Sequence, residues 1–196
     1  MATVTRHGSP KPLHIVVILG TIRSGRMSEV AADFISSRIR ARPTVTTELI
    51  DVRKFDFNFP EIDYGTALKE RFSFYADAIA RADGVVVVTP EYNHGYPGSL
   101  KMVLDILYPE YLHKAAAVVG VSSGPWGGVR VVENLTPVLK ELGFVTSQIA
   151  LNVEYVERAF GPDGTPTNPK LNARAEKFVT ELLWLAETLR WGRSNL

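Results

Sequence analysis

The sequence predicts an α/β fold, a three-layer sandwich in which one five-stranded parallel sheet lies between two layers of helices. Short runs of β-branched residues alternate with helix-length amphipathic stretches along the chain. The runs lack strict alternation of polar and apolar residues, as in Val85–Val88, which is typical of strands covered by helices on both faces. The 196 residues show no repeat and no low-complexity segment, so we expect one domain.

The first part of the chain predicts a strand, a helix and a second strand. His14–Leu19 is an apolar run of strand length, and Val45–Asp51 is a run rich in β-branched residues. Between them, Met27–Arg40 places apolar residues such as Ala31 and Ile35 on one face. This spacing predicts an amphipathic helix that packs on the sheet.

The central part continues the alternation. We expect helices at Ala67–Ala82 and Gly98–Leu107, with a strand at Gly84–Thr89 between them. The strand contains four consecutive valines, so both of its faces should be covered by helices.

The last part predicts two more strands and two more helices. The strands are Ala115–Ser122 and Phe144–Leu151. A helix at Val129–Leu142 is stopped by a glycine, and the final helix spans Asn172–Arg190 after a loop at Gly161–Pro169. We expect the strand order 2-1-3-4-5 for the sheet and assign residues 13–196 to the single domain.

Composition excludes several functional classes. The 22 Lys and Arg residues nearly balance the 21 Asp and Glu residues, so no general basic field attracts nucleic acid. The absence of cysteine excludes thiol nucleophiles and iron–sulfur ligation, and the four histidines lack metal-ligand spacing, so we expect no metal site. Any redox chemistry must therefore belong to a bound organic cofactor.

The distribution of apolar residues predicts a protein without a membrane partner. No apolar run approaches the length that crosses a bilayer. Residues 1–12 are polar and lead into no secretory segment, so we expect a disordered arm and a cytoplasmic location.

The loop after the first strand predicts a phosphate site. In an open parallel sheet, ligands bind beyond the carboxyl ends of the strands where the strand order reverses. The loop Gly20–Glu29 carries hydroxyls and arginines at a helix N-terminus, which favours an anion. Arg26 and Met27 stand where a P-loop needs Lys and Ser or Thr. Ile22 stands where a dinucleotide fingerprint needs glycine. Asp51, the candidate acid for the ribose, lies about 30 residues after the start of the loop, whereas the fingerprint places it about 20 residues on. A terminal monophosphate therefore fits best.

Two further loops predict a slot for a planar ring. Thr89–Ser99 and Ser122–Arg130 follow the third and fourth strands and combine rigid turns with aromatic residues. Backbone amides can bind the carbonyls and nitrogens of a heteroaromatic ring, and Tyr or Trp can cover its faces. With the phosphate loop, this arrangement predicts a site for flavin mononucleotide (FMN). The three loops offer no obvious acid, base or nucleophile, which agrees with chemistry carried by the cofactor.

These three loops resemble those of the NAD(P)H-dependent FMN reductases of flavodoxin-like fold, which include quinone, azo and chromate reductases. Gly20–Arg26 resembles the family's Gly-Ser-x-Arg phosphate loop, with Thr at position 21 in place of Ser. Thr89–Asn93 with Pro97–Lys101 resembles the flavin-ring loop, although Met102 follows where the family commonly has Asn. Ser123–Arg130 resembles the third loop.

The resemblance implies cofactor contacts and no catalytic side chain. The implied phosphate ligands are Thr21, Arg23, Arg26 and Ser28. The implied ring contacts are Pro90, Glu91, Tyr92 and Asn93, with Ser123, Gly124 and Gly127 on the pyrimidine side. Trp126 either lines the flavin pocket or packs on a neighbouring subunit.

The resemblance also implies the reaction. NADPH or NADH would pass a hydride to flavin N5, and a small acceptor such as a quinone, azo compound, free flavin or metal oxyanion would then take two electrons. An FMN-binding electron carrier or flavin store, and a flavin-free binder of a phosphate ligand, are the alternatives. Aromatic residues near the loops predict a homo-oligomer, and the resemblance implies a homodimer or homotetramer. They are Tyr92, Tyr96, Tyr108, Tyr111 and Trp126.

Overall fold

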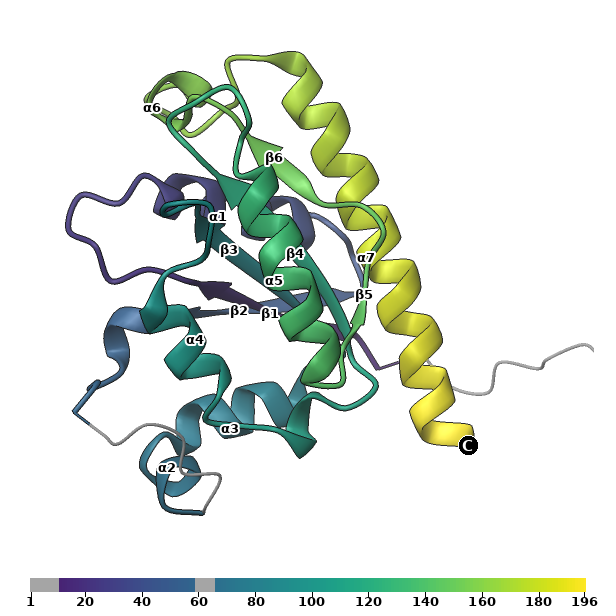
Figure 1. The fold of residues 1–196 in the computed structure, drawn as a ribbon. Coiled ribbons are helices and arrows are strands. Elements are labelled where there is room, and N and C mark those ends of the chain that lie inside the picture. Colours follow the sequence, from purple (N-terminus) through teal and green to yellow (C-terminus); the bar gives the residue numbers. More distant parts are fainter. Residues whose placement is uncertain (1–10, 59–65) are drawn as a thin grey trace, which may run out of the picture.

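The computed structural model describes residues 11–58 and 66–196 and consists of a twisted sheet with helices on both faces (Figure 1). The strands are β1 (Leu13–Leu19), β2 (Val45–Asp51), β3 (Gly84–Pro90), β4 (Ala115–Val121), β5 (Val145–Thr146) and β6 (Leu151–Val153). The α-helices are α1 (Ser28–Arg40), α2 (Thr66–Arg71), α3 (Ser73–Arg81), α4 (Gly98–Leu104), α5 (Val129–Glu141), α6 (Val156–Ala159) and α7 (Pro169–Asn195). Short 3-10 helices span Val52–Lys54 and Pro109–Tyr111.

The sheet has the strand order that the sequence predicts. Its order is β2-β1-β3-β4-β5, and every pairing between these strands is parallel. The fold class and the flavodoxin-like topology are therefore confirmed. The order reverses at β1, which pairs with both β2 and β3, so the loops after β1 and β3 diverge from a common edge of the sheet.

The fifth predicted strand is not continuous. β5 pairs with β4 at Ala115 and Ala116, and β6 resumes the pairing at Val119. The N–H of Ser147 still donates to the carbonyl oxygen of Ala116 at 2.7 Å, and residues 148–150 then leave the sheet. Oγ of Ser147 accepts a hydrogen bond from the backbone N–H of Ile149 at 3.2 Å, and this local bond competes with the pairing to β4.

Several helices differ from the predicted bounds. The predicted helix Ala67–Ala82 is divided at Phe72, whose backbone leaves the helical region with φ −112° and ψ 41° and whose ring packs in the core against Phe55. α4 ends at Leu104, three residues before its predicted end. α7 begins earlier than predicted because Asn168 caps it by accepting a hydrogen bond from the N–H of Lys170 at 3.0 Å. α6 has no counterpart among the predicted elements.

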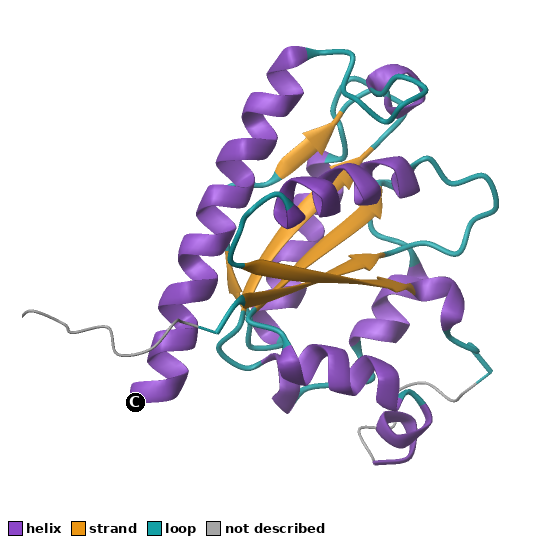
Figure 2. Cartoon of the chain, turned by 180° about the vertical axis from the view of Figure 1, so that it is seen from behind, coloured by secondary structure: helices purple, strands orange, loops and turns teal. Residues whose placement is uncertain are grey.

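Two apolar layers hold the helices on the sheet. Successive residues of β1 point to opposite faces. Val16 and Ile18 enter the layer beneath α3, α4 and α5, whereas Ile15 and Val17 enter the layer beneath α1 and α7. All four side chains are completely buried. Figure 2 shows α1 across the face of the sheet that is hidden in Figure 1, whereas α7 is visible along one side of the sheet in both views.

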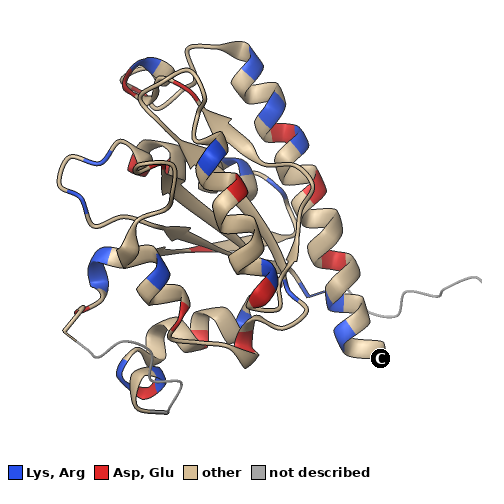
Figure 3. Ribbon diagram, in the orientation of Figure 1, with Lys and Arg blue, Asp and Glu red and all other residues tan. Residues whose placement is uncertain are grey.

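The ends of the described chain are tied to the sheet by α7. Nη1 of Arg190 donates hydrogen bonds to the carbonyl oxygens of Lys11 and Pro12 at 2.7 and 3.2 Å. The rest of the predicted arm, residues 1–10, lies outside the described residues. Acidic and basic residues recur along α7 (Figure 3), and none of the helices in the described ranges is long and apolar enough to cross a membrane.

Candidate functional site

An open cleft of about 200 Å³ lies at the carboxyl ends of the central strands. The loops after β1, β3 and β4 all line it, so the topology brings together the three loops that the sequence singles out. Figure 1 shows the loop between β1 and α1 extending beyond the strand ends at the left of the view. Seven of the predicted contact residues line this cleft: Arg23, Arg26, Ser28, Pro90, Glu91, Tyr92 and Ser123.

The start of α1 forms one wall of the cleft. The hydroxyl of Ser28 is buried and has no hydrogen-bond partner among the residues that the structure describes. No described side chain caps this helix end either, because Met27 occupies the N-cap position. A helix N-terminus carries partial positive charge and unsatisfied N–H groups. A buried orphan hydroxyl at this position fits the oxygen atoms of a phosphate.

Arg26 supports the loop from behind. Its Nη1 donates to Oδ1 of Asp51 at 2.7 Å, its Nη2 donates to Oδ2 at 2.5 Å, and its Nη1 also donates to the carbonyl oxygen of Thr21 at 2.6 Å. Its side chain is 1% exposed. These bonds commit both terminal nitrogens, so only Nε remains without a partner in the described chain. The pairing identifies Asp51 as the structural partner of an arginine.

The ion pair shifts the pKa values of both groups. The hydrogen bond with Asp51 raises the pKa of Arg26 above its ordinary value. Burial acts to raise the pKa of Asp51, but the hydrogen bonds from Arg26 and from the backbone N–H of Arg53 outweigh it and leave that pKa below its ordinary value. Both groups are therefore charged at neutral pH, so the ion pair that shapes the loop is intact there.

Arg23 differs from Arg26 in its surroundings. Arg23 lines the cleft and is exposed, and within residues 11–58 and 66–196 its guanidinium has no hydrogen-bond or ion-pair partner. Its backbone is fixed, because Nη2 of Arg53 donates to its carbonyl oxygen at 2.5 Å and its N–H donates to Oγ1 of Thr21 at 3.3 Å. Figure 3 shows that the loop between β1 and α1 carries basic residues and no acidic ones.

Hydrogen bonds join the three loops to one another. The hydroxyl oxygens of Thr21 and Tyr92 lie 2.9 Å apart and connect the first loop to the second. The carboxylate of Glu91 accepts from the backbone N–H of Arg130 at 3.2 Å and from its Nη1 at 3.3 Å, which caps α5 and connects the second loop to the third. Thr21 is buried and does not line the cleft. The cleft is therefore pre-organised by side chains that bridge its loops.

The tip of the second loop lies outside the cleft lining. The N–H of each of Tyr92 and Gly95 donates to the carbonyl oxygen of the other at 2.9 Å, which closes a tight turn. Asn93 and His94 at its tip have φ values of 49° and 68°, a region that asparagine tolerates better than most residues. Both are exposed. Asn93 does not line the cleft, and its contact with the ring stays a prediction.

The third loop uses its glycines for close packing. A Cβ atom at Gly128, where φ is 78°, would lie 2.6 Å from the backbone nitrogen of Val121, so only glycine fits. Gly127 is buried against Val153, and the carbonyl oxygen of Gly124 accepts from the N–H of Tyr155 at 3.1 Å. Trp126 is 60% exposed, with the guanidinium of Arg130 5.9 Å from its ring centre. Gly124, Trp126 and Gly127 do not line the cleft.

The sequence does not predict Glu157, which lines the cleft from α6. Oγ of Ser123 donates to Oε1 of Glu157 at 2.5 Å, and this bond lowers the pKa of Glu157 below its ordinary value. The only signal in the sequence is that this segment follows the fifth strand at the ligand-binding edge of the sheet. Within the described cleft, Glu91 accepts a hydrogen bond from Arg130 and Glu157 accepts one from Ser123. The arrangement therefore favours binding and orientation of a ligand over acid–base chemistry.

Known proteins provide an independent comparison. Residues 13–157 match the family model described as NADPH-dependent FMN reductase. The chain is 29% identical over 171 residues to an NAD(P)H-dependent FMN reductase of Schizosaccharomyces pombe, covering 84% of this chain and 76% of the relative. It is 31% identical over 137 residues to a quinone reductase of Escherichia coli, covering 65% and 69% of the two chains.

The fold is shared with solved flavoenzymes. FerB, an NAD(P)H:(acceptor) oxidoreductase of Paracoccus denitrificans, superposes with a TM-score of 0.73 at 23% identity and covers 90% of this chain and 98% of its own. This likeness supports the flavodoxin-like architecture. The family match covers most of the chain, including all three loops of the cleft. The chain therefore belongs to the NADPH-dependent FMN reductase family.

Proposed function

We propose that this protein is an NAD(P)H-dependent FMN reductase of the quinone-reductase type, with FMN held in the cleft at the carboxyl ends of the strands. The observation that carries the proposal is the buried, unpartnered hydroxyl of Ser28 at the uncapped start of α1, beside the exposed guanidinium of Arg23. Together they offer a hydroxyl, helix N–H groups and a free cation to one phosphate. Bound FMN would supply the chemistry by accepting a hydride from NADPH or NADH and passing two electrons to the acceptor.

The residues of the chain would bind and orient the cofactor. Ser28, Arg23 and the first N–H groups of α1 would hold the phosphate, and Arg26 would keep the loop in place. Pro90 and Tyr92 line the cleft where the ring is expected. The bridges between the loops fix these positions before a ligand arrives, which lowers the entropic cost of binding. Contacts from Thr21, Asn93, Gly124, Trp126 and Gly127 also stay predictions, and these five residues lie outside the cleft lining.

The absorbance spectrum of the purified protein, followed by NAD(P)H titration without oxygen, tests the proposal. We expect a flavin spectrum after incubation with FMN, and its rapid bleaching by NADPH or NADH. A flavin spectrum that bleaches only slowly favours the electron carrier or flavin store. A protein that stays colourless in excess FMN contradicts the cofactor assignment. The candidate acceptors are then quinones, azo compounds, free flavin and metal oxyanions. Quinones are included because one relative is named a quinone reductase.

We also propose a homodimer or homotetramer, on a smaller set of aromatic residues than the sequence suggests. Tyr111 is completely buried, with its hydroxyl 2.6 Å from that of Tyr75, so it belongs to the core. Tyr108 and Trp126 are 46% and 60% exposed, and an interface would cover such surfaces. Sedimentation velocity should give a dimer or tetramer at micromolar concentration, and a monomer with flavin bound would contradict this.

A further inference from the structure

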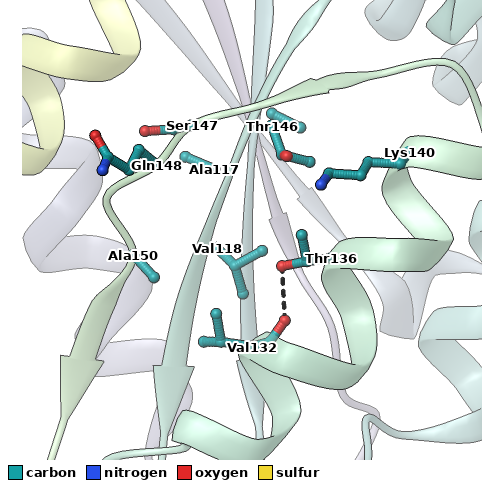
Figure 4. A pocket seen from close by; sticks show the side chains of 10 residues that line it. Ala117, Val118, Val132, Thr136, Lys140, Thr146, Ser147, Gln148 and Ala150 are labelled. Atoms are coloured by element: carbon teal, nitrogen blue, oxygen red, sulfur yellow. Dashed lines mark hydrogen bonds between the residues drawn. The ribbon is translucent and has the colours of Figure 1, made fainter.

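A second cavity lies beside β4, between α5 and the segment that joins β5 to β6 (Figure 4). Its volume is about 320 Å³, and it shares no lining residue with the cleft described above. Neither the loops at the strand ends nor the phosphate site extends to it. The ligand that this cavity can bind is therefore set by its own residues and is independent of the proposed flavin.

The backbone creates this cavity. β4 pairs with β5 through Ala116 and with β6 from Val119 onward, so Ala117 and Val118 have no strand partner at this edge. Residues 148–150 bulge away from the sheet at the same level. Alanine side chains at positions 116, 117 and 150 leave the resulting space open. Because a gap in strand pairing is a feature of the backbone, the cavity does not depend on one side-chain rotamer.

The lining combines an apolar floor with a polar rim. Val118 and Val132 contribute aliphatic surface, while Thr146, Ser147 and Gln148 contribute hydroxyl and amide groups. In the view of Figure 4, Lys140 approaches from α5 and Gln148 from the segment between β5 and β6.

Lys140 contributes the only formal charge among the described lining residues, which include no Asp or Glu. Lys140 is exposed and lies in the last turn of α5. Its Nζ has no ion-pair or hydrogen-bond partner in the described part of the chain. An unpaired ammonium group above an apolar floor favours a ligand that is both anionic and apolar.

We propose that this cavity binds a small organic carboxylate. The carboxylate would bind Nζ of Lys140 with the hydroxyl of Thr146, and the apolar body would rest on Val118 and Val132. A single cation near the negative end of the α5 dipole suits a singly charged group better than a phosphate dianion. The volume lies near the lower limit of about 300–1,000 Å³ for ligand pockets, so the ligand is compact.

Benzoate is a suitable probe, with benzamide as its neutral isostere. Titration of the ¹⁵N-labelled full chain, followed by NMR, should shift the amide signals of residues 117–118 and 146–150 saturably. We expect benzoate to bind about ten-fold tighter than benzamide, a difference of about 1.4 kcal/mol. Lys140→Met should remove that preference, whereas Lys177→Met, at an exposed position on α7, should leave it unchanged.

A second variant tests the space itself. Ala150 borders the cavity, and Ala150→Leu should fill part of it and weaken both probes about ten-fold. Benzoate shifts confined to residues 20–29 would place the carboxylate at the phosphate loop and overturn the proposal. Equal affinities of benzoate and benzamide, or an unchanged preference in Lys140→Met, would show that Lys140 only complements the α5 dipole, and would also overturn it. If Ala150→Leu fails to fold, the Lys140→Met comparison decides.

Discussion

Arg23 and Arg26 belong to one loop but have different tasks. Arg26 is buried and holds Asp51 and the carbonyl oxygen of Thr21, so it shapes the loop. Arg23 is exposed beside Ser28 and carries a guanidinium without a partner in the described residues. A bond to a ligand phosphate therefore falls to Arg23 in our proposal. The sequence offers both arginines equally, because it does not show which one a distant carboxylate occupies.

Arg23→Ala should weaken FMN binding about ten-fold to over a hundred-fold, because losing a charged hydrogen bond costs about 1.5–3 kcal/mol. Riboflavin, which lacks the phosphate, should bind almost as before. Quenching of flavin fluorescence measures both affinities. Arg40→Ala removes the same charge from the far end of α1 and is the control. Equal weakening of FMN and riboflavin would place the phosphate elsewhere.

The Arg26–Asp51 pair should make stability depend on pH in the acid range. The folded-state pKa of Asp51 is lowered, so the pair's contribution is present above the unfolded pKa of about 3.9 and is lost as pH falls through the folded value. Asp51→Asn should therefore lower the free energy of unfolding at pH 7, and the deficit should shrink below about pH 4. Urea unfolding at several pH values measures this. A deficit that stays constant down to pH 2 would mean that the carboxylate charge contributes nothing.

At the scale of elements, side chains that accept hydrogen bonds from N–H groups in the first turns of α5 and α7 fix where these helices begin. Glu91 caps α5 and pairs with Arg130. Because this is a positioning role and, in our proposal, bound FMN carries the chemistry, Glu91→Gln should lower turnover with NAD(P)H and a quinone by less than the 10²-fold or more typical of a lost acid or base. Glu133→Gln, at an exposed position on α5, is the control. A larger loss for Glu91→Gln would assign it a proton-transfer role.

The α7 cap gives a prediction for stability. Asn168 accepts a hydrogen bond from the N–H of Lys170 at 3.0 Å, with Pro169 at the first helical position. Asn168→Ala should therefore cost about 1 kcal/mol of unfolding free energy, as is typical of a lost N-cap. Asn195→Ala, at the other end of α7, should cost less. Equal effects of the two variants in urea unfolding would show that the cap is not what fixes the start of α7.

The elements differ in how far the sequence predicts them. Central strands such as β3 are long apolar runs, so local pattern alone finds them. The break between β5 and β6 depends on a side-chain bond of Ser147 and on where β4 offers partners, which periodicity does not reveal. α6 is only four residues long, and tertiary bonds such as that from Tyr155 to Gly124 hold it in place. Glu157 could not be predicted as a cleft residue for the same reason.

At the scale of the whole molecule, topology predicts the place of the site better than its contacts. The strand order brings three loops to one edge, and seven of the twelve residues singled out line one cleft there. Whether a loop residue faces the cleft depends on turns and glycine packing that join distant segments, as at Asn93 and Gly127. The structure also separates this cleft from the second cavity beside β4.

The central claim is that one cleft, with one bound FMN, serves the nicotinamide and the acceptor in turn. Steady-state kinetics with NADPH or NADH and a quinone, both varied, test it most directly. Because a single slot over the flavin cannot hold the nicotinamide and the acceptor together, we predict ping-pong kinetics with parallel double-reciprocal lines. Double-reciprocal lines that intersect when the quinone concentration is varied would show that both substrates bind together, and would contradict the account.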